Sequence, residues 1–449
     1  MLLILAGVTL GALTGDNGIL TKANEAKEKT EIASITEEIQ REILEEQLKS
    51  TRGKLTAEAL ETILTSKGTL STEENILDRT LTTTKGGYEI AVRDIWDGTL
   101  SSSTSGGTGD GGETGDGGNP PAGNTIQAGE TATGGNKEYT DTVSEKTATI
   151  PEGFTVSDKA GETNINNGLV VIGPDGSEFV WVPVDDINTM AKKTSGTDAN
   201  GNENYQGKLY NFSSNFTSSE MTSYGQGTTS YREPDVVTDY DGSATYLSAI
   251  NNILKTTSYS TSSAFKTDLQ KDYNSMVKSV NIYHGFYVGR YETSLNSSKV
   301  AQSKQGVTSS DASQTDTNMW YGLYARQKLY STSSVQGSMI WGSQWDSMMR
   351  WMQSNKIDVT SATPKDAATG ITTSKNTTRV TGSASKDKLS NIYDLLGNSY
   401  EWTLEADDTL FRVYRGGYYY GSNSPKLRIS SVPNNTMSDS GSRLALYLK

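Results

Sequence analysis

The pattern of apolar and charged positions predicts a helical region at the start of the chain. Residues 1–13, MLLILAGVTLGAL, form an apolar run of about a dozen residues, whereas a membrane-spanning helix needs about twenty. No basic region precedes this run, as one would in a signal peptide. Apolar residues then recur at steps of three and four, with Glu and Lys between them; they are Ile32, Ile35, Ile39 and Ile43. This spacing predicts an amphipathic helix or coiled coil, and we expect the helical region to span residues 1–50.

A small α/β appendage is predicted for residues 51–98. The segment LTAEALETILTS has the spacing of a short helix, STEENILDRT suggests a second, and GYEIAVRDIWDG alternates like a strand. Residues 99–136, which include SSSTSGGTGDGGETGDGGNPPAGN, have no apolar periodicity. A Gly-rich, acidic segment of this kind cannot bury enough apolar surface to become ordered, so we interpret it as a flexible linker.

Residues 137–449 have the patterning of a β-rich domain. The sequence GLVVIGPDGSEFVWVPV contains two apolar runs joined by Gly-Pro-Asp-Gly, which predicts a hairpin, and HGFYVGRYETS predicts another strand. Residues 185–280 are rich in Ser, Thr, Asn and Tyr, with short helical pieces such as LSAINNILK, and we interpret them as an insertion. The segment SQWDSMMRWMQS predicts an amphipathic helix with Ser343 as N-cap. Its core-facing stripe comprises Trp345, Met348, Met349 and Met352.

Composition narrows the chemistry that this chain can perform. The sequence has 449 residues, a formal net charge of −13 and no long run of Lys or Arg, so nucleic acid is not an expected partner. It contains no cysteine, which excludes disulfides, thiolate metal sites and cysteine nucleophiles. Its one histidine, His284, leaves little room for a zinc site or a Ser-His-Asp triad, and we expect a packing or surface role for it.

Three C-terminal motifs carry a resemblance to a known family. The segments NIYDLLGNSYEWT, RVYRGGYYYGS and GSRLALYLK resemble motifs of the formylglycine-generating enzyme, or sulfatase-modifying factor, family. The matching residues are Asp394, Gly397, Asn398, Glu401, Trp402, Arg415, Gly416, Gly417, Gly441, Arg443 and Leu444. EFVWVPV and GFYVGRYET match the opening strands of that family in the same order. The resemblance covers about residues 150–449 and implies a divergent C-type-lectin fold.

The motif residues also have a physical interpretation of their own. Gly397 and Asn398 both tolerate positive φ, which predicts a turn. Arg443 is expected to pair with Glu401 or Asp394. Trp402 is expected to be the core residue that anchors its strand. Arg415 is expected to lie beneath a bend, where the following glycines allow close approach of the backbone.

The resemblance has consequences for chemistry. The oxidases of the family use a pair of cysteines to bind copper and activate oxygen; this chain has none, so we do not expect it to be such an enzyme. A glycosidase-like carboxylate pair could come from Glu401, Glu405, Asp407 and Asp408, although an acidic loop is usually only solvated. Members of the family bind calcium around the Gly-Asn-x-x-Glu-Trp segment. The resemblance therefore implies Asn398 and Glu401 as calcium ligands, with hydrogen bonding of the turn as the alternative.

Three consecutive tyrosines follow the Arg-Gly-Gly motif. Neighbouring side chains of a strand point to opposite faces, so one core cannot bury all of Tyr418, Tyr419 and Tyr420. In non-enzymatic C-type-lectin folds this region faces the ligand, and Tyr, Ser, Asn and Gly are the residues that antibody loops use. The candidate ligand-binding residues are Tyr414, Tyr418, Tyr419, Tyr420, Ser422, Asn423, Asn434, Asn435 and Asp439. An ordinary polar sheet end is the alternative. Residues 418–442 also resemble segments that a diversity-generating retroelement mutates at adenines.

The start of the chain resembles a second family. LLILAGVTLGALTG running into NGILTKANEAKEKTEIA is similar to the helix of type IV pilin-like and pseudopilin proteins of Gram-positive anaerobes. In that family the helix is half membrane-embedded and half amphipathic. A basic leader, the glycine cleaved by prepilin peptidase and the first apolar turns are missing here, and we expect them to be encoded upstream of Met1.

These inferences predict an α+β protein with a long N-terminal α-helix of pilin type, a Gly-rich linker and a C-terminal C-type-lectin-like domain. The expected function is non-catalytic ligand binding by an adhesin-like or receptor-like protein at the cell surface. We expect a protein or glycan ligand, pilin-like subunits as partners of the helix, and membrane anchoring through it. The alternatives are a structural minor pilin or pseudopilin, and a sulfatase-modifying-factor-like enzyme with a cysteine-free site.

Overall fold

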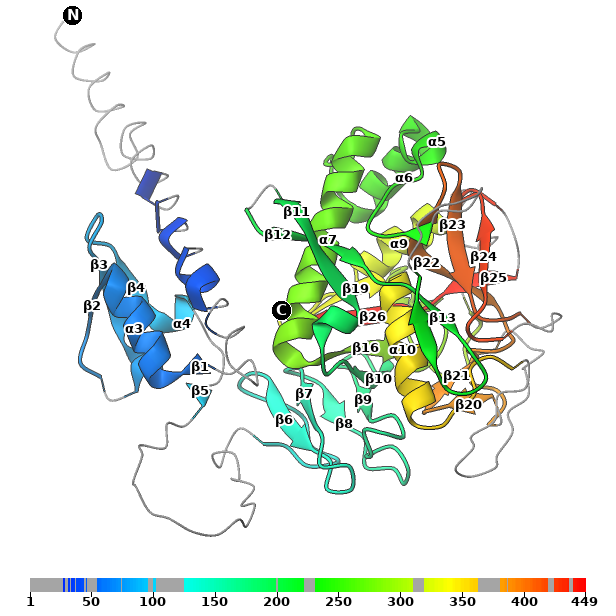
Figure 1. The fold of residues 1–449 in the computed structure, drawn as a ribbon, viewed down its shortest axis with the longest axis horizontal. Helices are drawn as coiled ribbons and strands as arrows, with labels where there is room; N and C mark the ends of the chain where they lie inside the picture. Colours follow the sequence, from blue (N-terminus) through cyan, green and yellow to red (C-terminus); the bar gives the residue numbers. More distant parts are fainter. Residues whose placement is uncertain are drawn as a thin grey trace, which may run out of the picture. The chain divides into compact units, whose positions relative to one another are not determined.

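The chain forms two compact units, Met1–Asp116 and Gly117–Lys449 (Figure 1). Both helices and strands are present, which confirms the α+β class. The computed structural model describes residues 27–28, 31–32, 34–36, 38–43, 46, 55–73, 75–95, 100–101, 125–198, 201–221, 231–309, 319–361, 380–385, 387–418, 424–435 and 439–449. We call the second unit the head.

The first unit contains a three-stranded antiparallel sheet in the order β2-β3-β4 and a parallel pair, β1-β5. Its elements are β1 (Leu55–Thr56), α3 (Ala57–Lys67), β2 (Gly68–Leu70), η1 (Ile76–Asp78), β3 (Thr80–Thr83), β4 (Glu89–Ala91), α4 (Val92–Ile95) and β5 (Leu100–Ser101). The predicted helix at LTAEALETILTS is α3, and Thr56 Oγ1 caps it by accepting a hydrogen bond from Ala59 N at 3.0 Å. The second predicted helix is only the 3-10 turn η1, and the predicted strand ends at Ala91, where α4 begins.

The amphipathic helical region and the appendage share one hydrophobic core. Helical turns are described between Lys27 and Glu46, and Ile39 and Ile43 are fully buried in a cluster that also contains Leu60 of α3. Residues on both sides of the predicted boundary at 50/51 therefore belong to the same hydrophobic core. Within the described residues no long N-terminal helix is evident, and none of the helices there is long and apolar enough to cross a membrane. The predicted apolar run lies outside the described residues.

The head is built on a six-stranded sheet in the order β19-β26-β16-β10-β9-β8. Its strands are β8 (Thr155–Val156), β9 (Val170–Ile172), β10 (Glu178–Pro183), β16 (Gly285–Gly289), β19 (Val335–Met339) and β26 (Leu444–Leu448). The antiparallel pair β9-β10 confirms the predicted hairpin. On β10, Phe179 and Trp181 belong to one hydrophobic cluster, while Val180 and Val182 belong to another. Because successive side chains face opposite sides, the sheet is covered on both faces, which explains its unbroken apolar sequence.

A second sheet has the order β15-β22-β23-β24, with β25 paired to β22 in parallel. Its strands are β15 (Tyr231–Arg232), β22 (Tyr400–Asp407), β23 (Phe411–Arg415), β24 (Arg428–Ser431) and β25 (Ser440–Ser442). All three C-terminal motifs therefore lie in or between these strands and β26. Small hairpins complete the head; they are β6 (Lys137–Thr140) with β7 (Thr147–Ile150), β11 (Ala191–Thr197) with β12 (Glu203–Gly207), β13 (Tyr210–Phe212) with β14 (Ser218–Glu220), β17 (Ser294–Leu295) with β18 (Ala301–Gln302), and β20 (Lys388–Leu389) with β21 (Ile392–Tyr393).

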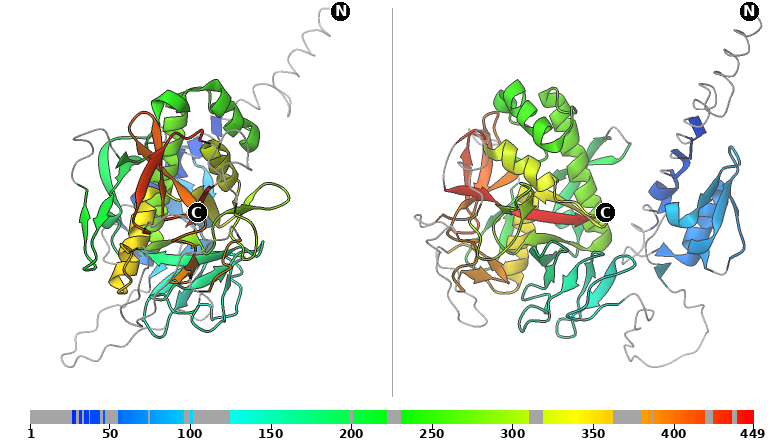
Figure 2. Two further views of the ribbon diagram at one scale, coloured as in Figure 1. Left: turned by 90° about the vertical axis from the view of Figure 1, so that its right-hand side faces the viewer. Right: turned by 180° about the vertical axis from the view of Figure 1, so that it is seen from behind.

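The helices of the head pack on these sheets. They are α5 (Thr238–Asp241), α6 (Ala244–Leu254), α7 (Ser262–Tyr283), α9 (Met319–Lys328) and α10 (Gly342–Ser354), with the 3-10 turn η2 (Ile187–Thr189). At 22 residues α7 is much longer than the short pieces predicted for the insertion, and it packs against β16 and β26 (Figure 2). The predicted insertion thus supplies part of the core. His284 ends α7 as its exposed C-cap.

Two predicted positions need correction. Ile126 and Ala132 are buried in the same cluster as Phe154, so the head begins before residue 137 and the predicted linker is too long. The N-cap of α10 is Trp341 rather than Ser343, whose hydroxyl lies 3.0 Å from Tyr273 Oη. The apolar stripe of that helix is buried as predicted.

Candidate functional site

The predicted tyrosine surface is partly buried. Tyr414 is only 6% exposed, and its ring meets the indole of Trp402 edge-on at 5.0 Å between centroids. Tyr418 is half-buried and stacks on Tyr400 at 4.6 Å. The prediction of Tyr414 as a ligand-binding residue is therefore wrong, because its ring belongs to the core. Tyr419, Tyr420, Ser422 and Asn423 lie outside the described residues.

The remaining polar candidates lie in two different places. Asn434 Nδ2 donates to Tyr246 Oη on α6 at 2.9 Å, and Asn435 Nδ2 donates to Ser431 Oγ at 2.9 Å. Asp439 lies elsewhere, where its backbone carbonyl accepts a hydrogen bond from Tyr400 N at 2.8 Å. Of the described candidates, Tyr414, Tyr418 and Asp439 therefore meet around Tyr400, whereas Asn434 and Asn435 bond other partners.

A buried charge network lies beneath the Arg-Gly-Gly motif. Arg415 Nη2 donates to Asp346 Oδ1 of α10 at 2.8 Å, and Arg428 bonds the other oxygen of Asp346. Arg428 Nε also donates to Glu405 Oε1 at 2.8 Å. At Gly416, where φ is +72°, a Cβ atom would lie 2.9 Å from the carbonyl oxygen of Leu395, so the bend requires glycine as expected. This network holds β23 and β24 against α10.

Both calcium candidates bond other side chains, although Asn398 Oδ1 itself has no hydrogen-bond partner among the described residues. Arg443 Nε donates to Glu401 Oε2 at 2.7 Å, its Nη2 bonds Glu401 Oε1, and the pair is buried, which confirms the predicted pairing with Glu401. Asn398 Nδ2 donates to Glu292. Burial, together with the charges of Asp394 and Glu401, raises the pKa of Glu292 well above its usual value.

This donor set does not fit calcium, which takes six or more oxygen ligands. The Arg443 guanidinium already supplies the positive charge that faces Glu401. Within the part of the chain that the structure describes, no group of three or more His, Cys, Asp or Glu side chains could hold a metal ion. The turn interpretation agrees with the backbone, because φ is +110° at Gly397 and +48° at Asn398. The described residues therefore favour hydrogen bonding of the turn over calcium binding at Asn398 and Glu401.

Three of the four candidate carboxylates are engaged in buried pairs or hydrogen bonds, and the fourth, Asp408, is partly exposed and accepts a hydrogen bond from Thr409 N. Glu401 pairs with Arg443, and Glu405 pairs with Arg428. Asp407 is buried and accepts a hydrogen bond from Ser430 Oγ. These side chains lie within β22 and its neighbours as structural ion pairs and hydrogen bonds.

A pocket of about 260 Å³ opens beside this network. The residues that line it are Tyr210, Asn211, Phe212, Met221, Tyr231, Lys426, Leu427 and Arg428. They come from the hairpin β13-β14, from β15 and from the segment that leads into β24. Asp346 positions two of these segments at once, because it accepts a hydrogen bond from Tyr210 N at 2.8 Å and also bonds Arg428.

Sequence reasoning found only one side of this pocket. Lys426, Leu427 and Arg428 belong to the segment predicted to face a ligand, but none of them was a candidate. Tyr210 and Tyr231 lie in the predicted insertion, which we treated as peripheral. The alternation in LYNFSS, with aromatic residues at every second position, is a strand signal that could have drawn attention to β13.

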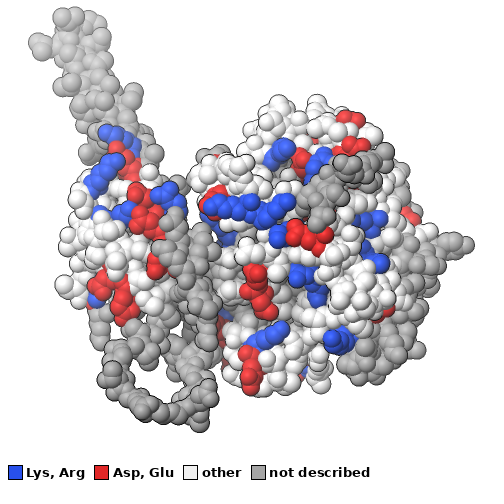
Figure 3. All heavy atoms as spheres, viewed as in Figure 1, with Lys and Arg blue, Asp and Glu red and all other residues white. Residues whose placement is uncertain are grey.

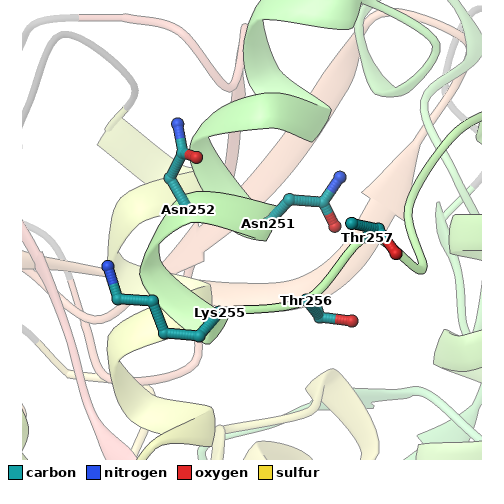
Figure 4. A pocket seen from close by; sticks show the side chains of 5 residues that line it. All are labelled: Asn251, Asn252, Lys255, Thr256 and Thr257. Atoms are coloured by element: carbon teal, nitrogen blue, oxygen red, sulfur yellow. The ribbon is translucent and has the colours of Figure 1, made fainter.

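A second hollow has a larger volume, but its polar side chains do not point toward one another. It has a volume of about 600 Å³ and lies at the C-terminal end of α6, where it is lined by Asn251, Asn252, Lys255, Thr256 and Thr257. Figure 4 shows that the side chains of Asn252 and Lys255 point away from that of Asn251, so the polar groups do not converge. Asn251 instead stabilises the following turn. Its Nδ2 donates to Tyr259 O, and its Oδ1 accepts a hydrogen bond from Tyr259 N.

The face of the head that Figure 3 shows carries charges of both signs. Figure 3 shows Lys and Arg interspersed with Asp and Glu on this face rather than gathered into a field of one sign. No family model matches the sequence, and neither a curated protein nor a solved structure matches it.

Proposed function

We propose that this chain is a non-catalytic ligand-binding protein, with the head as its recognition domain. The observation that carries the proposal is the pocket between β13 and β24, where parts of the chain far apart in sequence meet. Arg428 Nη1 donates to Tyr210 O at 2.9 Å across a separation of 218 residues. Tyrosine, methionine and arginine, which line this pocket, are enriched in the buried parts of protein interfaces.

The family resemblance and the display at the cell surface belong to the same proposal. The motif residues that carry the resemblance lie in buried pairs and turns, such as Arg443 with Glu401, and this supports a common fold. The N-terminal unit, in which helical turns and a small sheet share one core, supports a pilin-like base. In this proposal the base anchors the chain at the membrane and the head faces outward.

An array of bacterial and host surface proteins and glycans, probed with the purified chain, tests this proposal. Leu427→Asp places a charge on the pocket wall, and the matched control Asn252→Asp places the same charge at the α6 hollow. We expect at least one ligand that the parent and Asn252→Asp bind and Leu427→Asp does not, with equal melting temperatures for all three. Absence of any ligand, together with recovery of the chain in filaments, would favour the structural pilin alternative.

A further inference from the structure

Most polar groups around the pocket are already used. Arg428 directs its Nε to Glu405, its Nη1 to Tyr210 O and its Nη2 to Asp346. The hydroxyl of Tyr210 donates to Thr189 O at 2.8 Å. These groups therefore shape the pocket and leave few hydrogen bonds for a ligand.

Lys426 is the exception. Its Nζ donates to Phe212 O at 3.0 Å, and because an ammonium group carries three N–H donors, two remain. Among the residues that the structure describes, no carboxylate lies within ion-pair distance of Lys426 Nζ. The only other polar side chain at the rim without a described partner is Asn211, which is exposed.

The walls combine apolar and polar groups, and the space is small. Phe212, Met221, Tyr231 and Leu427 supply apolar parts of the lining. The volume of about 260 Å³ is below the range of roughly 300–1,000 Å³ that is typical of pockets for drug-sized ligands. The pocket therefore suits a single side chain or a single sugar ring.

We propose that this pocket takes one side chain of a protein partner, with an apolar body and a neighbouring or terminal carboxylate that pairs with Lys426. This inference rests on the proposed binding function. The carboxylate would form charge-assisted hydrogen bonds with the two remaining donors of the ammonium group. The apolar body would lie against Tyr231, Met221 and Leu427, as interface anchors do in pockets.

A sugar ring fits the same pocket less well. A pyranose carries several hydroxyl groups, and each one that is buried without a partner costs free energy. Lys426 and Asn211 could satisfy only a few of them, because Arg428 and Tyr210 are committed elsewhere. A single side chain with an apolar body brings fewer polar groups into the pocket, and its carboxylate is paired by Lys426.

Selection of a random peptide display library on the full chain tests the inference. We expect the enriched peptides to carry Asp or Glu beside an apolar residue. Their affinity should fall at least about tenfold on Lys426→Gln, which removes the charge but keeps two N–H donors on a shorter side chain. The matched control Lys255→Gln, in the α6 hollow, should bind like the parent. Replacing the acidic residue of a selected peptide by its amide should cause the same loss on the parent and no further loss on Lys426→Gln.

Trigalacturonate, an acidic sugar, serves as a second probe. The inference would be overturned if the selected peptides lacked acidic residues, or if they bound Lys426→Gln as tightly as the parent. It would also be overturned if no peptide were selected while trigalacturonate bound the parent and not Lys426→Gln. The last result would identify an acidic sugar as the ligand. If the proposed binding function itself is wrong, the result is distinguishable from these three, because no protein, peptide or glycan binds the chain.

Discussion

Trp402 and Tyr418 show how differently two aromatic residues on neighbouring segments serve the fold. Trp402 is fully buried against Tyr414, whereas Tyr418 is half-buried on the ring of Tyr400. We expect Trp402→Ala to cost about 3–5 kcal/mol of the free energy of unfolding. Tyr418→Ala should cost about 1–2 kcal/mol, between a surface and a core substitution. Urea unfolding of both variants beside the parent measures the difference, and equal losses would mean that Tyr418 is as much a core residue as Trp402.

We expect Glu233 to make the stability of the head depend on pH. It is fully buried, accepts hydrogen bonds from Gly342 N and Ser343 N, and lies near Glu405, whose Oε2 has no hydrogen-bond partner among the described residues. Burial, and then the charge of Glu405, raise the pKa of Glu233 from 4.5 to about 8. The folded chain therefore holds a proton that the unfolded chain loses between these two values, so stability falls as pH rises through that window.

Glu233→Gln should remove this pH dependence. The parent should lose up to about 1.4 kcal/mol of unfolding free energy per pH unit between pH 5 and 8 from this group, and the variant should show a flatter profile. The surface control Glu220→Gln should keep the slope of the parent. Denaturant unfolding at several pH values measures the three profiles, and a variant as steep as the parent would show that Glu233 is already ionised in the folded chain.

Among the elements, those with strong local signals could be predicted from the sequence. The hairpin β9-β10 follows from Gly-Pro-Asp-Gly between apolar runs, and α10 follows from its Trp and Met spacing. The helix α7 was missed because Ser, Thr and Asn separate Phe265, Leu269, Val277 and Val280, which nevertheless recur on one face. The pocket could not be predicted, because its segments meet only through long-range hydrogen bonds such as that of Arg428 with Tyr210.

We expect the amphipathic helix to stabilise the first unit and not the head. Ile43 is only 1% exposed, in a core that contains Leu60, Leu64 and Leu81. Ile43→Ala should therefore lower the free energy of unfolding of the first unit by about 2–5 kcal/mol, as other large-to-small core changes do. Hydrogen exchange, read segment by segment, should show faster exchange in α3 and β3 only. Faster exchange in β10 or β26 as well would contradict a separate core.

At the scale of the whole molecule, the hydrophobic clusters divide by unit. The cluster of the first unit draws its members from residues 39–95, and both clusters of the head draw theirs from residue 126 onwards. Domains with cores of their own can fold alone, and their boundaries fall in Gly- and Pro-rich segments; residues 105–124 have this composition.

Removing residues 1–116 should therefore leave the head folded. Calorimetry of the full chain should show two transitions, and the shortened chain should keep the transition of the head within about 2 °C. A change of 1 kcal/mol moves a domain of about 150–250 residues by about 2–4 °C, and a larger domain by less. Trp402→Ala should shift only the transition of the head, and Ile43→Ala only the other. A single transition that both variants shift together would show that the two units unfold as one.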